Sequence, residues 1–251
     1  MTKKTFALLI VGALSWAASA HAQKLPTPIT VGAERMDLLL PTLQGKRAAL
    51  MVNQSSLVGS TGTHLVDTLL SQGINIVRLF VPEHGLRGKV DAGKNVRSGV
   101  DEKTGLPVVS LYGQRKRPTP EMLADIDLLV FDLQDVGTRF YTYISSMHYL
   151  MEACAEEGKT FVVCDRPNPN DFIDGPILEP DCRSFIGVDP LPVAHGMTVG
   201  ELALMIDGER WLRGGNTCHV KVIPMAGWSH GDPYELPVRP SPNLPNSRSI
   251  E

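Results

Sequence analysis

The sequence predicts an α/β fold with a Rossmann-like, mostly parallel sheet and helices on both faces. Short apolar runs typical of buried strands alternate with segments of helical periodicity along most of the chain. Residues that favour turns and helix caps separate these segments. Such alternation is typical of a parallel sheet whose strands are joined by crossing helices.

The apolar runs give the expected strands, which span residues 47–52, 74–81, 107–111, 127–131 and 160–164. Helices are expected between them, at 63–72, from Pro120 onward and at 140–157. The last expected helix runs from Thr198 to about Leu212, because Thr198 and Glu201 have the spacing of a capping box. From Pro224 onward the periodicity fails and proline becomes frequent, so an extended tail is expected.

The N-terminus has the pattern of a secretory signal peptide. Lys3 and Lys4 precede an apolar run that is short for a membrane span, and small residues follow it up to Ala22. Residues 1–22 are therefore expected to be a signal peptide, although an uncleaved anchor remains the alternative. Residues 23–223 would form the Rossmann-like domain, and 224–251 a proline-rich tail. An exported protein, periplasmic or extracellular, is predicted, with no membrane span after cleavage.

Composition excludes several classes of partner and cofactor. The formal net charge of −3 gives no reason to expect nucleic acid, and 43% hydrophobic residues suit an ordinary core. The sequence contains no C-x-x-C or H-E-x-x-H motif of the kind that binds a metal. No G-x-G-x-x-G motif follows a strand either, so no cofactor is expected. Of the four cysteines, Cys182 and Cys218 are the favoured pair if a disulfide forms.

Polar residues follow each predicted strand, at the edge where open α/β sheets bind ligands. They are Asn53-Gln54-Ser55, Pro82-Glu83-His84-Gly85, Tyr112-Gly113, the run from Asp132 to Arg139, and Asp165-Arg166-Pro167-Asn168-Pro169. Glu83, Asp132 and Asp165 are therefore expected to project into one cleft. His195, just before the helix that Thr198 opens, is a further candidate for this edge.

Structural alternatives exist for these residues. Glu83 and His84 could be a solvated loop pair, and Asp132 and Asp135 could cap the helix near residue 140. Asp165 and Arg166 could form a structural ion pair. His64, His148 and His219 are interpreted as ordinary surface or packing residues.

A carboxylate-rich edge without a metal or nucleotide motif suits glycoside hydrolysis. That reaction needs an acid to protonate the leaving oxygen and a second group that attacks the anomeric carbon, stabilises it or activates water. Amides and arginines would hold hydroxyls and a carboxylate substituent of the sugar. An esterase or deacetylase could use similar residues, although no G-x-S-x-G elbow occurs.

At these residues the sequence resembles the exo-acting β-N-acetylmuramidase family, which was long catalogued as a domain of unknown function. The matching stretches are Asn53-Gln54-Ser55, the run from Leu79 to Gly88, Asp91-Ala92-Gly93, Ser110-Leu111-Tyr112-Gly113, the run from Phe131 to Tyr143, and Asp165-Arg166-Pro167-Asn168-Pro169. The similarity covers essentially all of the expected mature chain.

The resemblance implies a Rossmann-like domain that hydrolyses a non-reducing terminal N-acetylmuramic acid from peptidoglycan fragments, with no redox cofactor. It also implies that Glu83 is catalytic. With the strand ends, it gives the candidate catalytic residues Glu83, Asp132 and His84. The candidate substrate-binding residues are Asn53, Gln54, Tyr112, Gln134, Asp135, Arg139, Tyr141, Asp165 and Arg166.

One feature departs from the family pattern. Family members continue past a Pro-Ser-Pro-Asn-Leu-Pro segment into a smaller second domain. In this sequence the segment occupies residues 240–245, and the sequence ends soon after it. The sequence is therefore expected to lack the second domain. A non-catalytic protein that binds cell-wall fragments is the alternative function, although an aromatic content of 6% mildly favours an enzyme over a receptor that stacks sugars.

Overall fold

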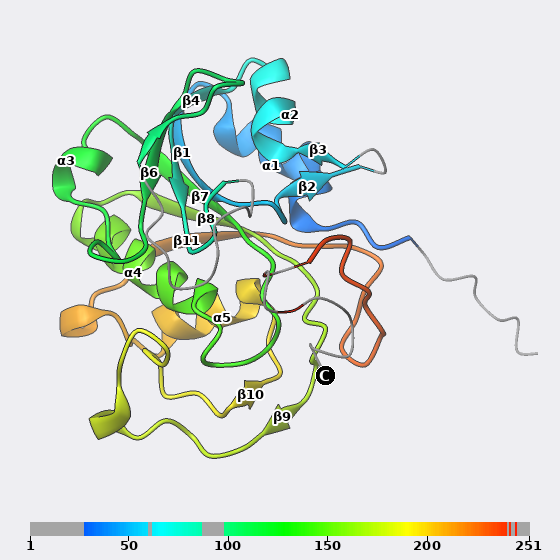
Figure 1. The fold of residues 1–251 in the computed structure, drawn as a ribbon, viewed down its shortest axis with the longest axis vertical. Coiled ribbons are helices and arrows are strands. Elements are labelled where there is room, and N and C mark those ends of the chain that lie inside the picture. The colour runs from blue at the N-terminus through cyan, green and yellow to red at the C-terminus, as the bar shows by residue number, and fades with distance from the viewer. Residues whose placement is uncertain (1–27, 60–61, 87–97, 240, 242–243, 245–251) are drawn as a thin grey trace, which may run out of the picture.

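A seven-stranded sheet with helices on both faces forms the centre of the molecule (Figure 1). The computed structural model describes residues 28–59, 62–86, 98–239, 241 and 244. The strand order is β11-β8-β7-β1-β4-β6-β5, and every pairing is parallel except that of the edge strand β5 with β6. The predicted fold class is confirmed.

The strands of this sheet are β1 (Arg47–Val52), β4 (Asn75–Val81), β5 (Gly99–Val100), β6 (Pro107–Ser110), β7 (Leu128–Asp132), β8 (Thr160–Cys164) and β11 (His219–Ile223). Two short antiparallel pairs lie outside it, β2 (Leu57–Val58) with β3 (Thr63–His64), and β9 (Ile173–Asp174) with β10 (Ala194–His195). The helices are α1 (Met36–Leu43), α2 (Leu65–Ser71), α3 (Pro120–Leu123), α4 (Tyr143–Glu156) and α5 (Val199–Gly208). Three 3₁₀ turns complete the described elements, η1 (Gly32–Glu34), η2 (Pro180–Cys182) and η3 (Arg213–Gly215).

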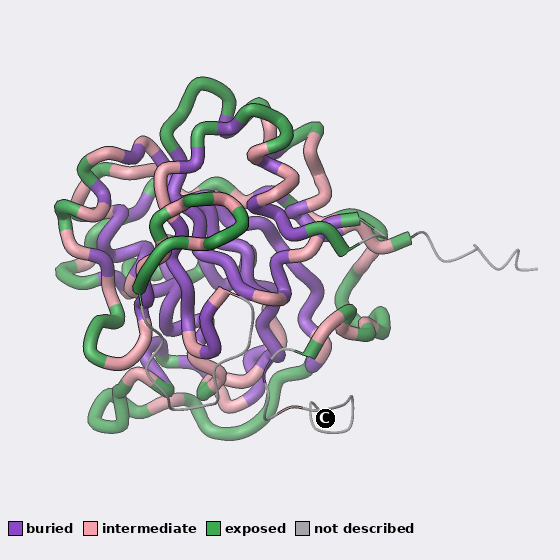
Figure 2. The backbone as a smooth tube through the Cα atoms, turned by 45° about the horizontal axis from the view of Figure 1, so that its top comes forward, coloured by how far each residue is buried: buried purple, intermediate pink, exposed green. Residues whose placement is uncertain are grey.

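Alternate residues of the buried strands build two cores, one on each face of the sheet. On β1, Ala49 and Met51 pack in the core that α4 and α5 cover, while Ala48, Leu50 and Val52 pack in the core that α1 and α2 cover. Figure 2 shows the buried residues gathered in the interior and the exposed residues around them. Helices cover both faces of the sheet, so the strands carry apolar residues on both sides. The strands therefore appear as continuous apolar runs in the sequence.

The strand order has a topological switch point between β1 and β7. From β1 the chain adds β4 and β6 on one side, then returns to place β7, β8 and β11 on the other. This is the doubly wound order, which leaves its binding crevice at the carboxyl ends of the two strands beside the switch point. Asn53 follows one of these strands and Asp132 ends the other.

Several elements differ from the expectations. The helix expected at 63–72 begins at Leu65, because Thr63 and His64 form β3. His64, interpreted as an ordinary histidine, is its N-cap: Nδ1 accepts from the Val66 N–H at 3.3 Å, and Nε2 lies 3.0 Å from the Asn53 carbonyl. Helix α1 and strand β11 were not predicted, and α5 ends at Gly208 rather than near Leu212. The capping box of Thr198 and Glu201 is confirmed.

The long helix expected from residue 140 begins at Tyr143. The preceding residues instead pair with the β10 segment: Thr138 forms a bridge with Ala194, and the Arg139 N–H donates to the Val193 carbonyl at 2.8 Å. Residues 138–141 form a turn, closed by the Tyr141 N–H that donates to the Thr138 carbonyl at 3.0 Å, and this turn occupies the positions where the first helical residues were expected.

The favoured disulfide is wrong, because all four cysteines are free. Cys182 is exposed on η2, whereas Cys218 is buried in the core beside α4 and α5. Burial raises the pKa of the Cys218 thiol to about 12, and that of Cys154 and Cys164 well above its usual value.

The tail beyond Pro224 is more closely attached than expected. Its described part holds no helix or strand, as predicted, and most of residues 224–239 are exposed or half-buried. However, Ala226 pairs with Thr30, the Arg239 carbonyl accepts from Gln54 at 3.3 Å, and Ser241 is 4% exposed. The predicted signal peptide lies outside the described residues. No helix within the described ranges is both long and apolar enough to cross a membrane.

Candidate active site

The predicted polar residues lie at one edge of the sheet, because the strands that precede them are parallel. β4, β1, β7 and β8 are consecutive neighbours, and their carboxyl ends lead to Glu83, Asn53, Asp132 and Asp165. The shared edge is confirmed. The acids differ sharply, however, in what surrounds them.

Glu83 is carried on a tight turn with an unusual backbone. The Gly85 N–H donates to the Pro82 carbonyl at 3.1 Å, which closes a turn with Glu83 and His84 as its central residues. His84 has φ 70°, the left-handed conformation that a type II turn requires at its third position and that glycine normally supplies. A larger residue held there costs on the order of 1 kcal/mol or more, and such strain clusters at functional sites.

Three phenol groups interact electrostatically with the Glu83 carboxylate. Burial, then a hydrogen bond with Glu83 and its negative charge, raise the pKa of Tyr112 to about 12. The charge of Glu83 also contributes to the raised pKa values of Tyr141 and Tyr143, where burial is the largest cause. The Tyr141 and Tyr143 rings meet edge to face, with centroids 4.5 Å apart. All three tyrosines are therefore protonated hydrogen-bond donors at neutral pH.

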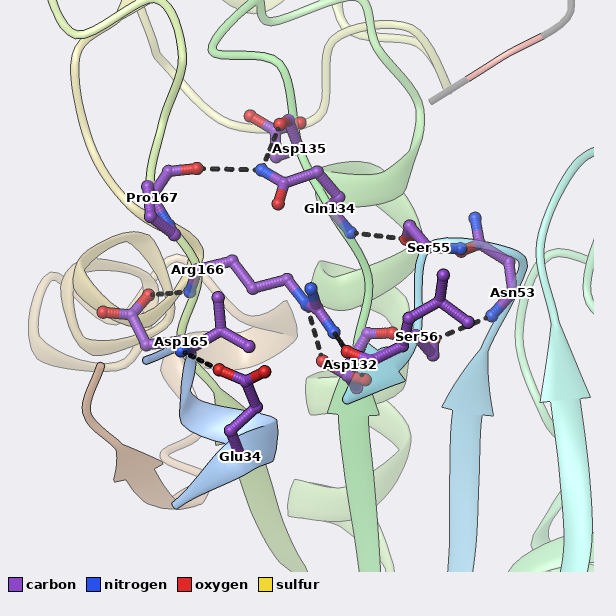
Figure 3. A network of polar contacts seen from close by, with 12 residues as sticks. Glu34, Asn53, Ser55, Ser56, Asp132, Gln134, Asp135, Asp165, Arg166 and Pro167 are labelled. Carbon is purple, nitrogen blue, oxygen red and sulfur yellow. Dashed lines mark hydrogen bonds and ion pairs between the residues drawn. The ribbon is translucent and has the colours of Figure 1, made fainter. Parts of the chain in front are cut away.

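Asp132 is sealed into an ion pair with Arg166 (Figure 3). Arg166 donates from Nε to Asp132 Oδ1 at 2.7 Å and from Nη2 to Oδ2 at 3.0 Å. Asp132 is 0% exposed and Arg166 2% exposed, so neither offers a free edge to a substrate. These contacts are structural, because each residue neutralises a charge that would otherwise be buried alone, and they give no support to the predicted roles in catalysis and substrate binding, which stay predictions.

Asp165 is also committed to the fold. Its carboxylate accepts from the Gly200 N–H at 2.8 Å, from the Thr198 hydroxyl at 3.1 Å and from the Arg166 N–H at 3.0 Å. Burial raises its pKa, and these hydrogen bonds oppose the rise. Asp165 therefore fixes the start of α5, and the prediction that it binds substrate has no support in these contacts.

The predicted amides join neighbouring loops. Ser55 Oγ donates to Asn53 Oδ1 at 2.6 Å and accepts from the Gln134 N–H at 3.0 Å, while Gln134 Nε2 donates to the carbonyls of Asp135 and Pro167 (Figure 3). The side chain of Gln54 also interacts with Tyr143 by hydrogen bonding. This network ties the loops after β1, β7 and β8 to one another.

Arg139 does not join this group. Its Nη1 donates to the Pro176 carbonyl at 2.9 Å and to the Leu191 carbonyl at 2.5 Å. These bonds hold the segment between β9 and β10 and favour a structural role over the predicted contact with substrate.

Asp135 pairs with a histidine that the sequence marked only as a further candidate. Asp135 Oδ2 accepts from the Gly137 N–H at 2.8 Å and lies 3.1 Å from His195 Nε2. Neither side chain caps a helix. The spacing of 60 residues between the two explains why no local pattern revealed the pair.

Ser241 is a residue at this edge that sequence reasoning missed. Its Oγ lies 3.2 Å from Nε2 of His84, which is 4% exposed. The Pro-Ser-Pro-Asn-Leu-Pro segment had been noted in the sequence, but nothing local indicated a contact with the Glu83 turn. Among the described residues, no group of three or more His, Cys, Asp and Glu side chains is arranged to hold a metal ion.

The fold and this edge define the class of protein: a doubly wound α/β domain with polar loops at its switch point and, after the neighbouring strand β4, a carboxylate hydrogen-bonded to a tyrosine. Residues 48–248 match the family model described as exo-beta-N-acetylmuramidase NamZ, N-terminal. The chain therefore belongs to the NamZ N-terminal family.

Relatives of known name or structure agree with this membership. The chain is 48% identical over 225 residues to the peptidoglycan beta-N-acetylmuramidase NamZ of Bacillus subtilis strain 168, which covers 85% of this chain and 53% of that protein. Two crystal structures of DUF1343 family proteins from Bacteroides fragilis superpose with TM-scores of 0.80 and 0.81, at 44% and 40% identity. They cover 89% and 88% of this chain, and 59% and 57% of their own. The chain thus spans little more than half the length of these relatives.

Proposed function

We propose that this chain carries the catalytic edge of an exo-acting glycoside hydrolase that releases non-reducing terminal N-acetylmuramic acid from peptidoglycan fragments. The observation that carries the proposal is Glu83, a half-buried carboxylate on a strained turn with a hydrogen bond to Tyr112. The name of the Bacillus subtilis relative supports the substrate class. Because the chain spans about half of that relative, the activity of the whole protein is part of the proposal.

In this mechanism Glu83 protonates the oxygen of the leaving group. A glycosidase acid must be held in place and must carry a proton when the bond breaks. The turn of residues 82–85 holds the Glu83 backbone in place. Neutral Tyr112 donates a hydrogen bond to the ionised Glu83 carboxylate after proton transfer. Asp132 and Arg166 take no part in the proton transfer and keep the loops after β7 and β8 in register.

The proposal includes export to the periplasm or the extracellular space, where peptidoglycan fragments occur. Its support is the signal-peptide pattern of residues 1–22. Mass determination of the secreted protein would test it, with cleavage after Ala20 or Ala22 as the expected result.

The test of the activity is hydrolysis of a chromogenic N-acetylmuramic acid glycoside. Glu83→Gln keeps the size of the side chain and removes its acid, so the rate should fall by roughly 10²- to 10⁴-fold. Glu209→Gln makes the same change at an exposed position at the end of α5 and serves as the matched control. Its rate should equal that of the wild type.

Two outcomes would contradict the proposal. Near wild-type hydrolysis by Glu83→Gln would remove Glu83 from the proton-transfer step. Binding of the glycoside by the wild type without any turnover would favour the alternative of a non-catalytic binding protein.

A further inference from the structure

Backbone contacts accompany the side-chain contact between Asp135 and His195. His195 lies on β10, and its N–H donates to the Gly137 carbonyl at 3.1 Å, while the adjacent Thr138 and Ala194 form a bridge. These backbone contacts hold the Asp135 loop against β10 independently of the side chains. The two side chains are thus brought together by the backbone pairing of residues 137–138 with residues 194–195.

The hydrogen bonds of His195 fix its tautomer. The Met197 N–H donates to Nδ1 at 3.2 Å, so Nδ1 carries a lone pair and the ring proton is on Nε2. Nε2 is therefore the donor in the 3.1 Å contact with Asp135 Oδ2. His195 therefore donates from Nε2 alone, and this hydrogen bond orients the Asp135 carboxylate.

The other oxygen of Asp135 has no partner. Oδ2 accepts from both His195 and Gly137, whereas Oδ1 is buried without a hydrogen bond. A buried polar atom left unpaired costs the free energy of its lost hydration and calls for an explanation. A ligand that supplies a donor to Oδ1 would remove that cost.

The loop after β7 carries Asp135 at the same edge of the sheet as the Glu83 turn after β4. The Asp135 side chain is 5% exposed and that of His195 0%, so Asp135 is the outer member of the pair. The charges of Asp135 and Glu83 both contribute to the raised pKa of Tyr141, which places this phenol near both acids. Figure 3 shows Asp135 at the outer end of the network, beyond Asp132 and Arg166.

We propose that Asp135 Oδ1 accepts a hydrogen bond from the sugar bound at this edge, and that His195 is the positioning residue that aims this carboxylate. This inference rests on the proposed function. An ionised carboxylate with one free oxygen takes a donor and repels an acid, so it binds an amide N–H or a hydroxyl of the sugar. The carboxylate substituent of the same sugar must lie elsewhere.

Asp135→Asn is the most informative variant. Its amide oxygen can face Gly137 and His195 and keep both hydrogen bonds, so the fold should be retained. Its NH₂ group then takes the place of Oδ1. Because an NH₂ group cannot accept a hydrogen bond, the donor of the ligand loses its partner. The binding constant of the full chain for N-acetylmuramic acid, measured by calorimetry, should weaken by roughly ten- to a hundredfold with little change in melting temperature.

The source of the donor can be separated with two substrate analogues. One chromogenic glycoside lacks the 2-acetamido group and the other lacks the 4-hydroxyl. The analogue that lacks the true donor should lose the sensitivity to Asp135→Asn, because the two changes remove the same hydrogen bond. Full sensitivity with both analogues would exclude these two donors and overturn the proposed contact.

The role of His195 is tested through its dependence on Asp135. His195→Leu removes the donor, whereas His195→Gln keeps an amide that can donate to Oδ2. We expect kcat/KM to fall about tenfold in His195→Leu, to recover in His195→Gln, and to fall no further when His195→Leu is added to Asp135→Asn. Equal effects of His195→Leu in both backgrounds would show a purely structural role.

Failure of this inference differs from failure of the proposed function. If the wild type binds the sugar but does not hydrolyse the glycoside, and Asp135→Asn weakens binding, the inference stands and the proposed hydrolysis fails. If the wild type hydrolyses the glycoside and Asp135→Asn binds and reacts normally, the inference alone is overturned. A wild type that does not bind the sugar overturns both.

Discussion

The loops after β4 and β7 lie at the same edge of the sheet, yet their acids have opposite surroundings. Asp132 has both oxygens on one guanidinium and is 0% exposed, whereas Glu83 is half-buried among tyrosines. A position at the carboxyl end of a parallel strand therefore places an acid near a binding crevice without giving it a role. The role of each acid depends on the groups that contact it. A buried cation makes the acid part of the structural framework, while neutral hydrogen-bond donors leave the carboxyl group able to transfer a proton.

The largest expected effect tests the framework side of this comparison. Arg166→Ala would leave Asp132 charged and buried without a partner, and the free energy of unfolding should fall by roughly 3–5 kcal/mol. Denaturant titration would measure it. The double variant Asp132→Leu with Arg166→Met should be clearly more stable than Arg166→Ala, because it removes both charges together.

A stable Arg166→Ala protein with low activity would reverse the assignment. It would mean that Arg166 serves the reaction rather than the fold. Glu83→Gln provides the opposite pattern for comparison, since it should lower activity and leave the melting temperature unchanged.

A second prediction concerns a buried cluster away from this edge. His148 lies 2.8 Å from Asp189 and 3.4 Å from Glu152, and Arg117 lies 3.7 Å from the same glutamate. Burial alone would lower the pKa of His148, but its hydrogen bonds to Asp189 and Glu152 outweigh burial and raise the pKa to about 9. The stabilisation is therefore complete below the unfolded pKa of about 6.5 and is lost as the pH rises through 9.

The free energy of unfolding should accordingly fall by roughly 1–3 kcal/mol between pH 6.5 and 9.5 because of this residue. His148→Asn should flatten that part of the pH profile, whereas His219→Asn, at an exposed histidine, should preserve it. An unchanged slope in His148→Asn would show that another group titrates.

A third prediction examines the donor side of the comparison. Tyr112→Phe removes the phenol that hydrogen-bonds Glu83 and keeps the ring that packs 6.4 Å from Phe185. The rate should fall about tenfold, in line with the loss of one hydrogen bond to a charged group. An unchanged rate in Tyr112→Phe would separate Tyr112 from the action of Glu83.

The smallest expected effect is at the tail. Ser241→Ala removes the contact with His84, and kcat/KM should fall by roughly two- to tenfold because a neutral hydrogen bond is worth about 1 kcal/mol. Ser229→Ala, on an exposed part of the same tail, is the control. Identical behaviour of the two variants would show that the tail contact has no bearing on the Glu83 turn.

The fold was predictable because its signals are local. Apolar runs and the Thr198 capping box gave most strands and one helix start correctly, and the edge followed from the rule for parallel sheets. The roles of the acids were not predictable in the same way. Arg166 pairs with Asp132 across 34 residues and His195 with Asp135 across 60, and no local spacing encodes which buried charges meet. Helix α1 was missed although it is apolar, and it carries Pro41 in its interior.

The contact between Ser241 and His84 also has a consequence for synthesis. It joins residues 157 positions apart, so the turn that carries Glu83 leaves the ribosome long before its partner does. Contacts of such sequence separation form late and slowly, since a long loop must close first. The nascent protein can therefore pair its central strands β1, β4 and β7 early, while the environment of its proposed catalytic acid is completed only when the region of Ser241 has been made.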